Sequence, residues 1–353
     1  MRIGSARLRR WSLVLGLTAG VCAQAHAQER TGAPFRNQPA CNSYTPAAVG
    51  GPTLPARVPG LTLRWLGTSN YELVYKGKIV LLDAYYDRGP RNRSVGFTPD
   101  QVKRADAILI GHAHFDHISD AAPIAARTGA AVVGAAISAD YLRSQGLPEG
   151  QVFAVADGSH FQLSDDITVD VALARHSTLS ADVLRDASQV YADSQGAPTS
   201  EEAAAEGAVR ARGSSDPNII TQGTLAYVLT FDTGFRLLWL DSAGPVTPGD
   251  EALAAKLGRI DAAIIAYQGT PVASVQVPVT NALVQLFKPA VFLPAHHDEI
   301  VGTFFNLGLE PLFEAIHAEL PQTRTLNPLY RAPICLDTTR PDGGLPPSYP
   351  AGP

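Results

Sequence analysis

The sequence has few charged residues: Asp, Glu, Lys and Arg make up 17% of its 353 residues, and the formal net charge is −5. Beyond the N-terminus it has no run rich in Lys or Arg. Binding to nucleic acid requires a basic surface that neutralises phosphates, so we expect no nucleic-acid partner. After the first 27 residues it also lacks an apolar segment long enough to cross a bilayer, so we expect no integral membrane segment in the mature chain.

Cysteine is scarce, with three in the chain. Cys22 lies in an N-terminal leader, so the mature chain would keep Cys41 and Cys335. Their separation is wrong for a metal site, which needs clustered thiols. In an oxidising compartment we predict that they form a disulfide, the alternative being two unpaired thiols.

Residues 1–27 have the three parts of a secretory signal peptide. A basic n-region precedes a short apolar h-region, Trp11 to Val21, and Ala25-His26-Ala27 is an A-x-A cleavage site. The n-region contains Arg2, Arg7, Arg9 and Arg10. We therefore predict a periplasmic or secreted protein. A twin-arginine signal and a lipoprotein signal at Cys22 are alternatives that the flanking residues fit poorly.

The rest of the chain divides by composition. Residues 28–58 are rich in Pro, Gly, Ala and Asn and predict an extended N-terminal arm, whereas 59–353 predict one α/β domain, interrupted by a polar insertion at 179–222. We expect strands at Leu61–Leu66, Tyr71–Tyr75, Lys78–Asp83, Ala105–Gly111, Ala131–Val133, Val152–Val155, Ile167–Leu173, Thr224–Phe231, Phe235–Leu240, Asp261–Ala266 and Ala290–Leu293, and helices from about Ser119, at Thr280–Leu286 and at Pro311–Leu320.

The strongest chemical signal is Gly111-His112-Ala113-His114-Phe115-Asp116-His117 at the end of a predicted buried strand. An extended backbone points the side chains of His112 and His114 the same way. Asp116 and His117 are adjacent and would diverge, which suits a second metal beside the first. Imidazole and carboxylate ligands favour Zn, although Mn and Fe also accept them. The segment therefore predicts a metal site.

Four further metal-capable residues also follow predicted strands. His176 comes after Ile167–Leu173, Asp241 comes directly after Phe235–Leu240, and the pair His296-His297 comes after Ala290–Leu293. The C-terminal ends of strands collect site residues in layered α/β folds. We therefore expect these residues to complete the metal site.

Together, H-x-H-x-D-H, a lone His, a strand-terminal Asp and a strand-terminal His resemble the metal signature of the metallo-β-lactamase superfamily. The resemblance covers about residues 61–300. It implies an α/β fold of the αββα four-layer sandwich type. It also implies one metal on His112, His114 and His176, and a second on Asp116, His117 and His296, with Asp241 bridging. His297 is the alternative last ligand or a group behind it.

The opening Leu63-Arg64-Trp65-Leu66-Gly67 and the strand ending in Asp83 resemble the branch of L-ascorbate-6-phosphate lactonase and N-acylphosphatidylethanolamine phospholipase D. The resemblance implies a secreted binuclear hydrolase that uses a metal-bridging hydroxide to cleave a small-molecule lactone, ester or phosphodiester. The alternatives are amide hydrolysis of the β-lactamase type and a non-catalytic periplasmic metal- or ligand-binding protein. True β-lactamases of this fold lack the bridging Asp matched by Asp241, which disfavours the former.

Several residues have predicted roles at this site. Asp116 would orient the hydroxide and accept its proton. Asp83 would hold a ligand histidine in one tautomer, or instead cap backbone amides as a buried carboxylate. Tyr85 and Tyr267 follow predicted strands and are candidates for substrate binding, although each also fits a packing role. The substrate, the native metal and the oligomeric state are not defined by the sequence.

The insertion at 179–222 leaves three residues after His176 and returns at the next strand. Long connections inside a compact domain are usually functional or disordered. Thr199 and Glu202 form a capping box that predicts a helix over Glu201–Arg212, ended by Gly213. We predict that the insertion is a lid that selects the substrate, the alternative being a surface insertion with no role in binding.

Overall fold

The computed structural model describes residues 35–178, 180–183, 185–186, 189, 193, 196–267, 273–298 and 308–346. The predicted signal peptide lies outside them. The strands are β1 (Gly60–Trp65), β2 (Tyr71–Tyr75), β3 (Lys78–Leu82), β4 (Ala107–Leu109), β5 (Ala131–Gly134), β6 (Val152–Ala154), β7 (His160–Ser164), β8 (Ile167–Leu173), β9 (Leu225–Phe231), β10 (Arg236–Leu240), β11 (Ala262–Ala266), β12 (Val291–Ala295), β13 (Arg324–Thr325) and β14 (Ile334–Asp337).

The described helices are mostly short. They are α1 (Phe115–Ile118), α2 (Ala121–Thr128), α3 (Ala136–Ser144), α5 (Ser200–Arg210), α6 (Ile219–Gln222), α7 (Pro248–Leu257), α8 (Ala273–Phe287) and α9 (Glu310–Glu319). Four 3₁₀ turns accompany them: η1 (Pro39–Cys41), η2 (Ala47–Val49), η3 (Pro99–Gln101) and η4 (Glu149–Gln151). No described helix is both long and apolar enough to cross a membrane.

Two seven-stranded sheets face each other across a shared core. Their strand orders are β14-β1-β2-β3-β4-β5-β6 and β13-β12-β11-β10-β9-β8-β7. Apolar side chains from both sheets, such as Leu63, Leu109, Tyr227 and Trp239, are fully buried between them. Sheets with helices on their outer faces are buried on both sides, which explains why their strands are almost continuously apolar.

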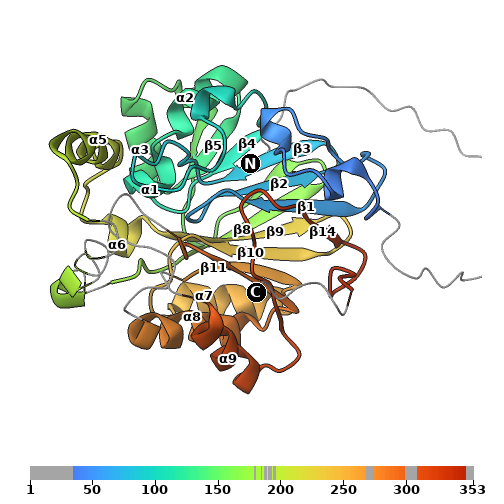
Figure 1. Cartoon of the computed structure of the whole chain (residues 1–353). Coiled ribbons are helices and arrows are strands. Elements are labelled where there is room, and N and C mark those ends of the chain that lie inside the picture. Colours follow the sequence, from blue (N-terminus) through green and yellow to red (C-terminus); the bar gives the residue numbers. More distant parts are fainter. Residues whose placement is uncertain are drawn as a thin grey trace, which may run out of the picture.

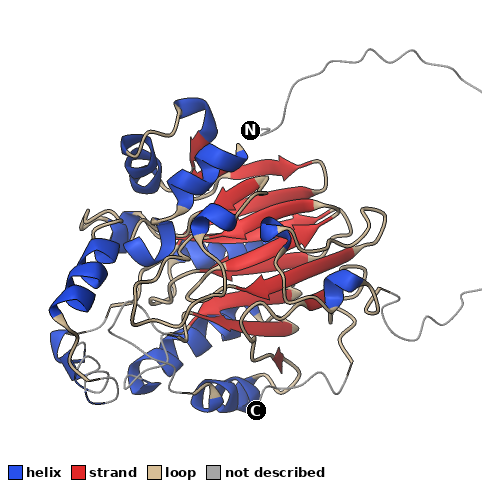
Figure 2. Cartoon of the chain, turned by 45° about the horizontal axis from the view of Figure 1, so that its top comes forward, coloured by secondary structure: helices blue, strands red, loops and turns tan. Residues whose placement is uncertain are grey.

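Each sheet carries its own helical layer on the outside (Figure 1). The helices α1, α2 and α3 cover the first sheet, where Ile108 and Val132 meet Ile124 and Leu142 in a second apolar cluster. The helices α7, α8 and α9 cover the other sheet. Figure 2 shows the strands gathered in the centre with the helices around them. The predicted αββα four-layer sandwich is therefore the architecture of the described residues.

The segment before β1 is attached to the first sheet. Arg64 and Glu72 face each other on β1 and β2 as a fully buried ion pair of 2.9 Å between Nη1 and Oε1. The carboxylate of Glu72 also accepts the backbone amides of Ala47 and Ala48. Cys41 forms a disulfide with Cys335 on β14, so this segment is covalently joined to the strand that pairs with β1 from near the C-terminus of the sequence. It contains the 3₁₀ turns η1 and η2 rather than being extended throughout.

Several elements differ from the sequence-based expectation. The helix expected from about Ser119 is preceded by α1, so Asp116 and His117 lie on a helical turn and not on an extended strand end. Helix α8 begins at Ala273, seven residues before the expected Thr280, and accommodates Pro278 in its interior. Helices α3 and α7 and strands β7 and β14 were not expected.

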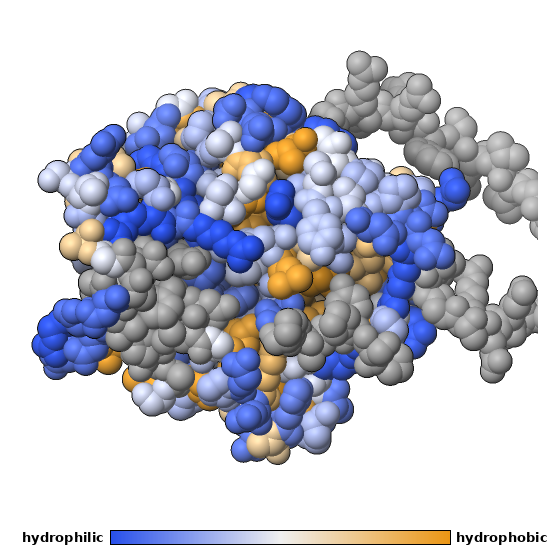
Figure 3. Space-filling model, viewed as in Figure 1, coloured by the Kyte–Doolittle hydropathy of each residue, from blue (hydrophilic) through white to orange (hydrophobic). Residues whose placement is uncertain are grey.

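The surface is largely hydrophilic on the face drawn in Figure 3, where apolar residues form small patches between polar ones. Only a few large apolar side chains among the described residues are exposed, and these are Tyr44, Ile220, Val275 and Leu329. Scattered apolar residues of this kind are ordinary on a folded surface and indicate no binding face by themselves.

Candidate metal centre

The expected ligands meet at one edge of the sandwich because each follows the C-terminal end of a strand. His112 comes after β4 and His114 caps α1, which itself carries Asp116 and His117. The remaining three follow strands of the other sheet: His176 after β8, Asp241 after β10 and His296 after β12. The centre is therefore built between the two sheets, and both contribute ligands.

The first ligand group consists of His112, His114 and His176. His112 Nε2 lies 3.0 Å from His114 Nδ1, which lies 3.1 Å from His176 Nε2. Nitrogens bound tetrahedrally to Zn at about 2.0–2.1 Å are about 3.3 Å apart, so this spacing suits one metal. Burial lowers the pKa of His176 to about 3 and that of His112 well below its usual value. Neutral imidazoles have the lone pairs that a metal needs.

The second ligand group consists of Asp116, His117 and His296. Asp116 Oδ2 lies 3.3 Å from His117 Nε2 and 3.1 Å from His296 Nε2. Burial alone would raise the pKa of Asp116, but His117 and His296 outweigh it and hold the pKa well below its usual range. Asp116 is therefore a carboxylate, the form that binds a metal or accepts a proton.

Asp241 joins the two ligand groups. Its Oδ2 lies 2.6 Å from His112 Nδ1 and 3.2 Å from His117 Nδ1. Its Oδ1 is buried and has no hydrogen-bond partner among the described residues. Burial raises the pKa of Asp241 well above its usual value, and the nearby carboxylate of Asp83 adds to this. A cation beside this buried oxygen would stabilise the ionised carboxylate, so the residues present fit a metal centre.

Gly111 makes room for Asp241. A Cβ placed on Gly111 would lie 2.0 Å from the carboxyl carbon of Asp241. Any side chain at this position would therefore displace the carboxylate that joins the two groups. In the sequence, Gly111 is recognisable only as the residue before the first histidine of the motif. Its close approach to Asp241 becomes apparent only in the fold.

Asp83 supports both Gly111 and His117. Its Oδ1 accepts the Gly111 amide at 3.0 Å, and its Oδ2 lies 2.7 Å from His117 Nδ1. A proton on Nδ1 leaves Nε2 of His117 free to bind a metal. The predicted histidine-orienting role of Asp83 and its alternative role of capping an amide are thus both seen in one carboxylate.

We expect Asp83→Asn to weaken metal binding by roughly 10- to 100-fold. Asparagine has one oxygen, so its amide NH₂ must face either the Gly111 amide or the Nδ1 proton of His117. The backbone of Asp83 has φ 58°, which asparagine tolerates, so the effect would come from the side chain. Competition with a chromophoric chelator measures the affinity. Asp106→Asn is a matched control, since Asp106 also accepts a backbone amide at the other end of β3 and β4. Equal affinities in the two variants would contradict this role.

The other predicted site residues belong to none of the metal-capable groups among the described residues. His297 stacks on Trp65 with ring centres 4.1 Å apart, and burial lowers its pKa to about 4. Among the described residues, the metal-capable groups include His296 and not His297. Tyr85 is buried with its ring against Phe115, and Tyr267 is buried in the apolar cluster under α8 and α9. Both tyrosines therefore pack in the interior.

The described part of the insertion reaches the metal motif. The capping box of Thr199 and Glu202 begins α5, as expected. Val209 packs with Tyr85 and Phe115, and a Cβ on Gly213 would lie 2.3 Å from the Phe115 amide nitrogen. Arg212, which follows α5, forms ion pairs with Asp87 and with Asp120, a residue between α1 and α2. The contacts of Arg212 and Asp120 were not expected from the sequence.

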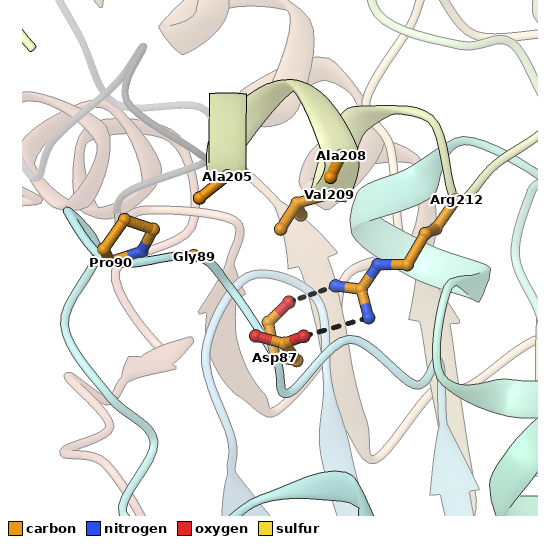
Figure 4. Close-up of a pocket in the computed structure, with 7 residues that line it drawn as sticks. All are labelled: Asp87, Gly89, Pro90, Ala205, Ala208, Val209 and Arg212. Atoms are coloured by element: carbon orange, nitrogen blue, oxygen red, sulfur yellow. Dashed lines mark hydrogen bonds and ion pairs between the residues drawn. The ribbon is translucent and has the colours of Figure 1, made fainter. Parts of the chain in front are cut away.

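A pocket of about 560 Å³ lies between α5 and the loop after β3 (Figure 4). Its wall on the helix is formed by Ala205, Ala208 and Val209, and the ion pair of Asp87 and Arg212 lies at its side. A second cavity of about 640 Å³ is lined by the metal-ligand candidate His176 and by Ile220 of α6. The helices α5 and α6 of the insertion therefore each line a pocket, and the pocket at α6 includes a candidate ligand.

Two helix-covered sheets with these two ligand groups at their shared edge define the metallo-β-lactamase fold. Residues 78–193 match the family model described as the beta-lactamase superfamily domain. The chain carries a domain of the metallo-β-lactamase superfamily, and the matched residues include His112, His114, Asp116, His117 and His176.

The chain is also similar to curated proteins of that superfamily. A UPF0173 metal-dependent hydrolase from Rubrobacter xylanophilus is 35% identical over 92 residues, which are 25% of this chain and 36% of that protein. The matched region therefore spans about a third of that relative's length.

Solved structures show the same fold over most of the chain. A metallo hydrolase from Ignicoccus hospitalis aligns with a TM-score of 0.54 and 14% identity, covering 78% of this chain and 98% of that one. A diiron beta-hydroxylase from Streptomyces venezuelae aligns with a TM-score of 0.51 and 14% identity, covering 81% of this chain and 55% of that one. At such identities the likeness establishes the fold alone.

Proposed function

We propose that the chain is a binuclear metal-dependent hydrolase. The observation that carries the proposal is that seven ligands form two groups joined by Asp241, whose free oxygen is buried. Two divalent cations held there, with Zn favoured and Mn or Fe also accepted by this ligand set, would lower the pKa of a water and polarise the bond to be cleaved. All seven expected ligands are present, which disfavours a non-catalytic binding protein.

Residues of the chain would accept the proton and hold the metal ligands in the correct state. Asp116 is ionised and can accept a proton from the attacking water. Asp83 fixes the tautomer of His117, and the burial of His112 and His176 keeps their rings neutral. Phe115, between two candidate ligands, packs against Tyr85 and Val209 and would limit the access of water on that side of the centre.

The proposed substrate is a lactone, ester or phosphodiester of small size. Its support is the presence of Asp241 together with the resemblance of Leu63–Gly67 and Asp83 to the lactonase and phospholipase D branch. The insertion at 179–222 remains our candidate for selecting the substrate, because α6 lines the cavity that His176 also lines, and Val209 of α5 packs with Phe115 in the metal motif. Amide hydrolysis of the β-lactamase type is the competing outcome in the assay below.

We also propose that the protein works outside the cytoplasm. The predicted signal peptide and the disulfide between Cys41 and Cys335 support this compartment, because such bonds persist where the environment is oxidising.

A panel of chromogenic lactones, carboxylic esters, phosphodiesters and β-lactams tests the function. We expect metal-loaded protein to hydrolyse at least one of the first three classes. We also expect a chelator to abolish the activity, and added Zn or Mn to restore it. A His112→Ala variant is the control for contaminating hydrolases. Hydrolysis of none of the four classes by metal-loaded protein, or hydrolysis that a chelator leaves intact, would contradict the proposal.

A further inference from the structure

Beside His296 lies a buried ion pair in which neither partner is a metal ligand. Asp298 Oδ2 lies 2.7 Å from Arg88 Nη1, and the two side chains are 4% and 1% exposed. The hydroxyl of Tyr330 also donates to Asp298 Oδ2. The other carboxylate oxygen, Oδ1, accepts the backbone amide of Thr68 at 2.9 Å. Asp298 therefore binds three partners from three separate parts of the chain.

Thr68 is the link between this ion pair and the metal centre. Its carbonyl oxygen accepts the backbone amide of His296 at 2.7 Å and the Nε1 proton of Trp65 at 2.8 Å. The ion pair thus fixes the amide side of Thr68, and the carbonyl side of Thr68 fixes the backbone of His296. Two hydrogen bonds separate Asp298 from a residue of the second ligand group.

Both residues that share this link have an unfavourable backbone conformation. Thr68 has φ 48° and His296 has φ 61°, in the left-handed region that L-residues avoid. Threonine, which is branched at Cβ, is especially disfavoured there. Such conformations persist only where the surroundings determine them, and they gather at functional sites. Here the hydrogen bonds from Thr68 to Asp298 and from His296 to Thr68 hold these two conformations in place.

The ion pair also connects the two sheets at the edge that holds the ligands. Arg88 follows β3 and Thr68 follows β1, both in the first sheet, whereas Asp298 and His296 follow β12 in the second. Next to Thr68, the hydroxyl of Ser69 donates to the carbonyl oxygen of Asp241 at 2.8 Å. The same short loop therefore contacts the backbone of His296 and that of Asp241.

We propose that the Arg88–Asp298 ion pair is a positioning device that sets the affinity of the second ligand group for its metal by holding Thr68 and His296 in their left-handed conformations. The proposal rests on the binuclear function proposed above and adds that the two metals are controlled separately. Among the described residues, the hydrogen bonds of Thr68 and Asp298 lead to His296 and not to His112, His114 or His176 of the first ligand group.

The test compares two buried ion pairs. Arg88→Met leaves Asp298 without its cation, and Arg64→Met does the same to the equally buried Glu72 at a place that supports no ligand. Arg88→Lys keeps one donor for Asp298. Tyr330→Phe removes the hydroxyl that donates to Asp298 and accepts from Arg88 Nη1 but keeps the ion pair itself, so it is the milder variant should Arg88→Met fail to fold. Each protein is stripped of metal and titrated with Co(II), and the visible spectrum and bound cobalt report the two sites apart from activity.

We expect wild type to bind two cobalt ions. In Arg88→Met the second should bind roughly 10- to 100-fold more weakly while the first is retained, as for other groups that support metal ligands. Tyr330→Phe should shift the second site in the same direction by less, and Arg88→Lys should recover part of the affinity. Arg64→Met should lower the free energy of unfolding and leave both cobalt affinities unchanged.

Two results would overturn the proposal while leaving the binuclear function intact. The first is that wild type binds two ions and that the second ion binds equally tightly in Arg88→Met or in Tyr330→Phe. The other is an equal loss at both sites in Arg88→Met and Arg64→Met, which would reduce the ion pair to a general contribution to stability. A wild type that binds no more than one ion would instead contradict the binuclear function itself.

Discussion

Replacing Asp116 by Asn is expected to reduce kcat/KM by about a thousandfold or more, since each 1.36 kcal/mol of lost transition-state stabilisation costs about tenfold in rate. Asp116 lies within 3.3 Å of both other members of its ligand group and is ionised, because His117 and His296 hold its pKa well below the usual range. Asparagine removes that charge and the oxygen that would accept the proton. The measurement is kcat/KM on the best substrate of the panel, together with the metal content.

The metal content separates the two contributions of Asp116. We expect the first ligand group to keep its metal in Asp116→Asn, because among the described residues Asp116 forms its hydrogen bonds and ion pairs with His117 and His296 and not with the first group. Asp120→Asn is a matched control: Asp120 is equally buried, but it accepts the amides of Tyr86 and Asp87 and belongs to no ligand group. It should lower stability and retain most of kcat. An Asp116→Asn enzyme with near wild-type kcat would show that another group activates the water.

Reducing the disulfide is expected to lower the free energy of unfolding by an amount on the order of 5 kcal/mol, an upper figure because the loop-entropy model often overshoots. Cys41 and Cys335 are 294 residues apart in sequence, with Cα atoms 5.8 Å apart. The bond ties the segment before β1 to β14, where Phe35, Ala40 and Leu54 pack around Cys335. Urea unfolding of oxidised and reduced protein measures the difference.

A Cys41→Ser, Cys335→Ser variant is the control, because its stability should not change with reductant. Thiol titration of denatured, unreduced protein should find neither cysteine reactive. Two reactive thiols at these positions would contradict the disulfide. Equal stability of the protein with and without reductant would contradict its predicted contribution to stability.

The strands were predictable because burial on both faces makes them continuously apolar. Tyr71–Tyr75 and Ile167–Leu173 match β2 and β8 as the structure has them. The missed β14 is only four residues long and gains its place by pairing with β1, more than 270 residues earlier, from Gly60 with Asp337 onward. No local pattern encodes such a pairing. Helix α7 was missed although Thr247 and Asp250 form a capping box at its start.

That the seven candidate ligands lie together was predictable, because they are chemically distinctive and follow strands. The residues that support these candidate ligands were less predictable. Gly111 and Asp83 could be noted from the motif and the strand end, but their contact with Asp241 and His117 depends on how the sheets stack. Arg88, Thr68 and Asp298 carry no local signal. Their link to His296 arises only when loops after β1, β3 and β12 meet.

The measurement that tests the central claim most directly is the number of metal ions per chain in purified mature protein, determined by elemental analysis. Seven ligands in two groups joined by Asp241 predict a value close to two, reached at the latest after reconstitution with Zn or Mn. A value well below one that does not rise on reconstitution would contradict the binuclear centre and, with it, the proposed hydrolase.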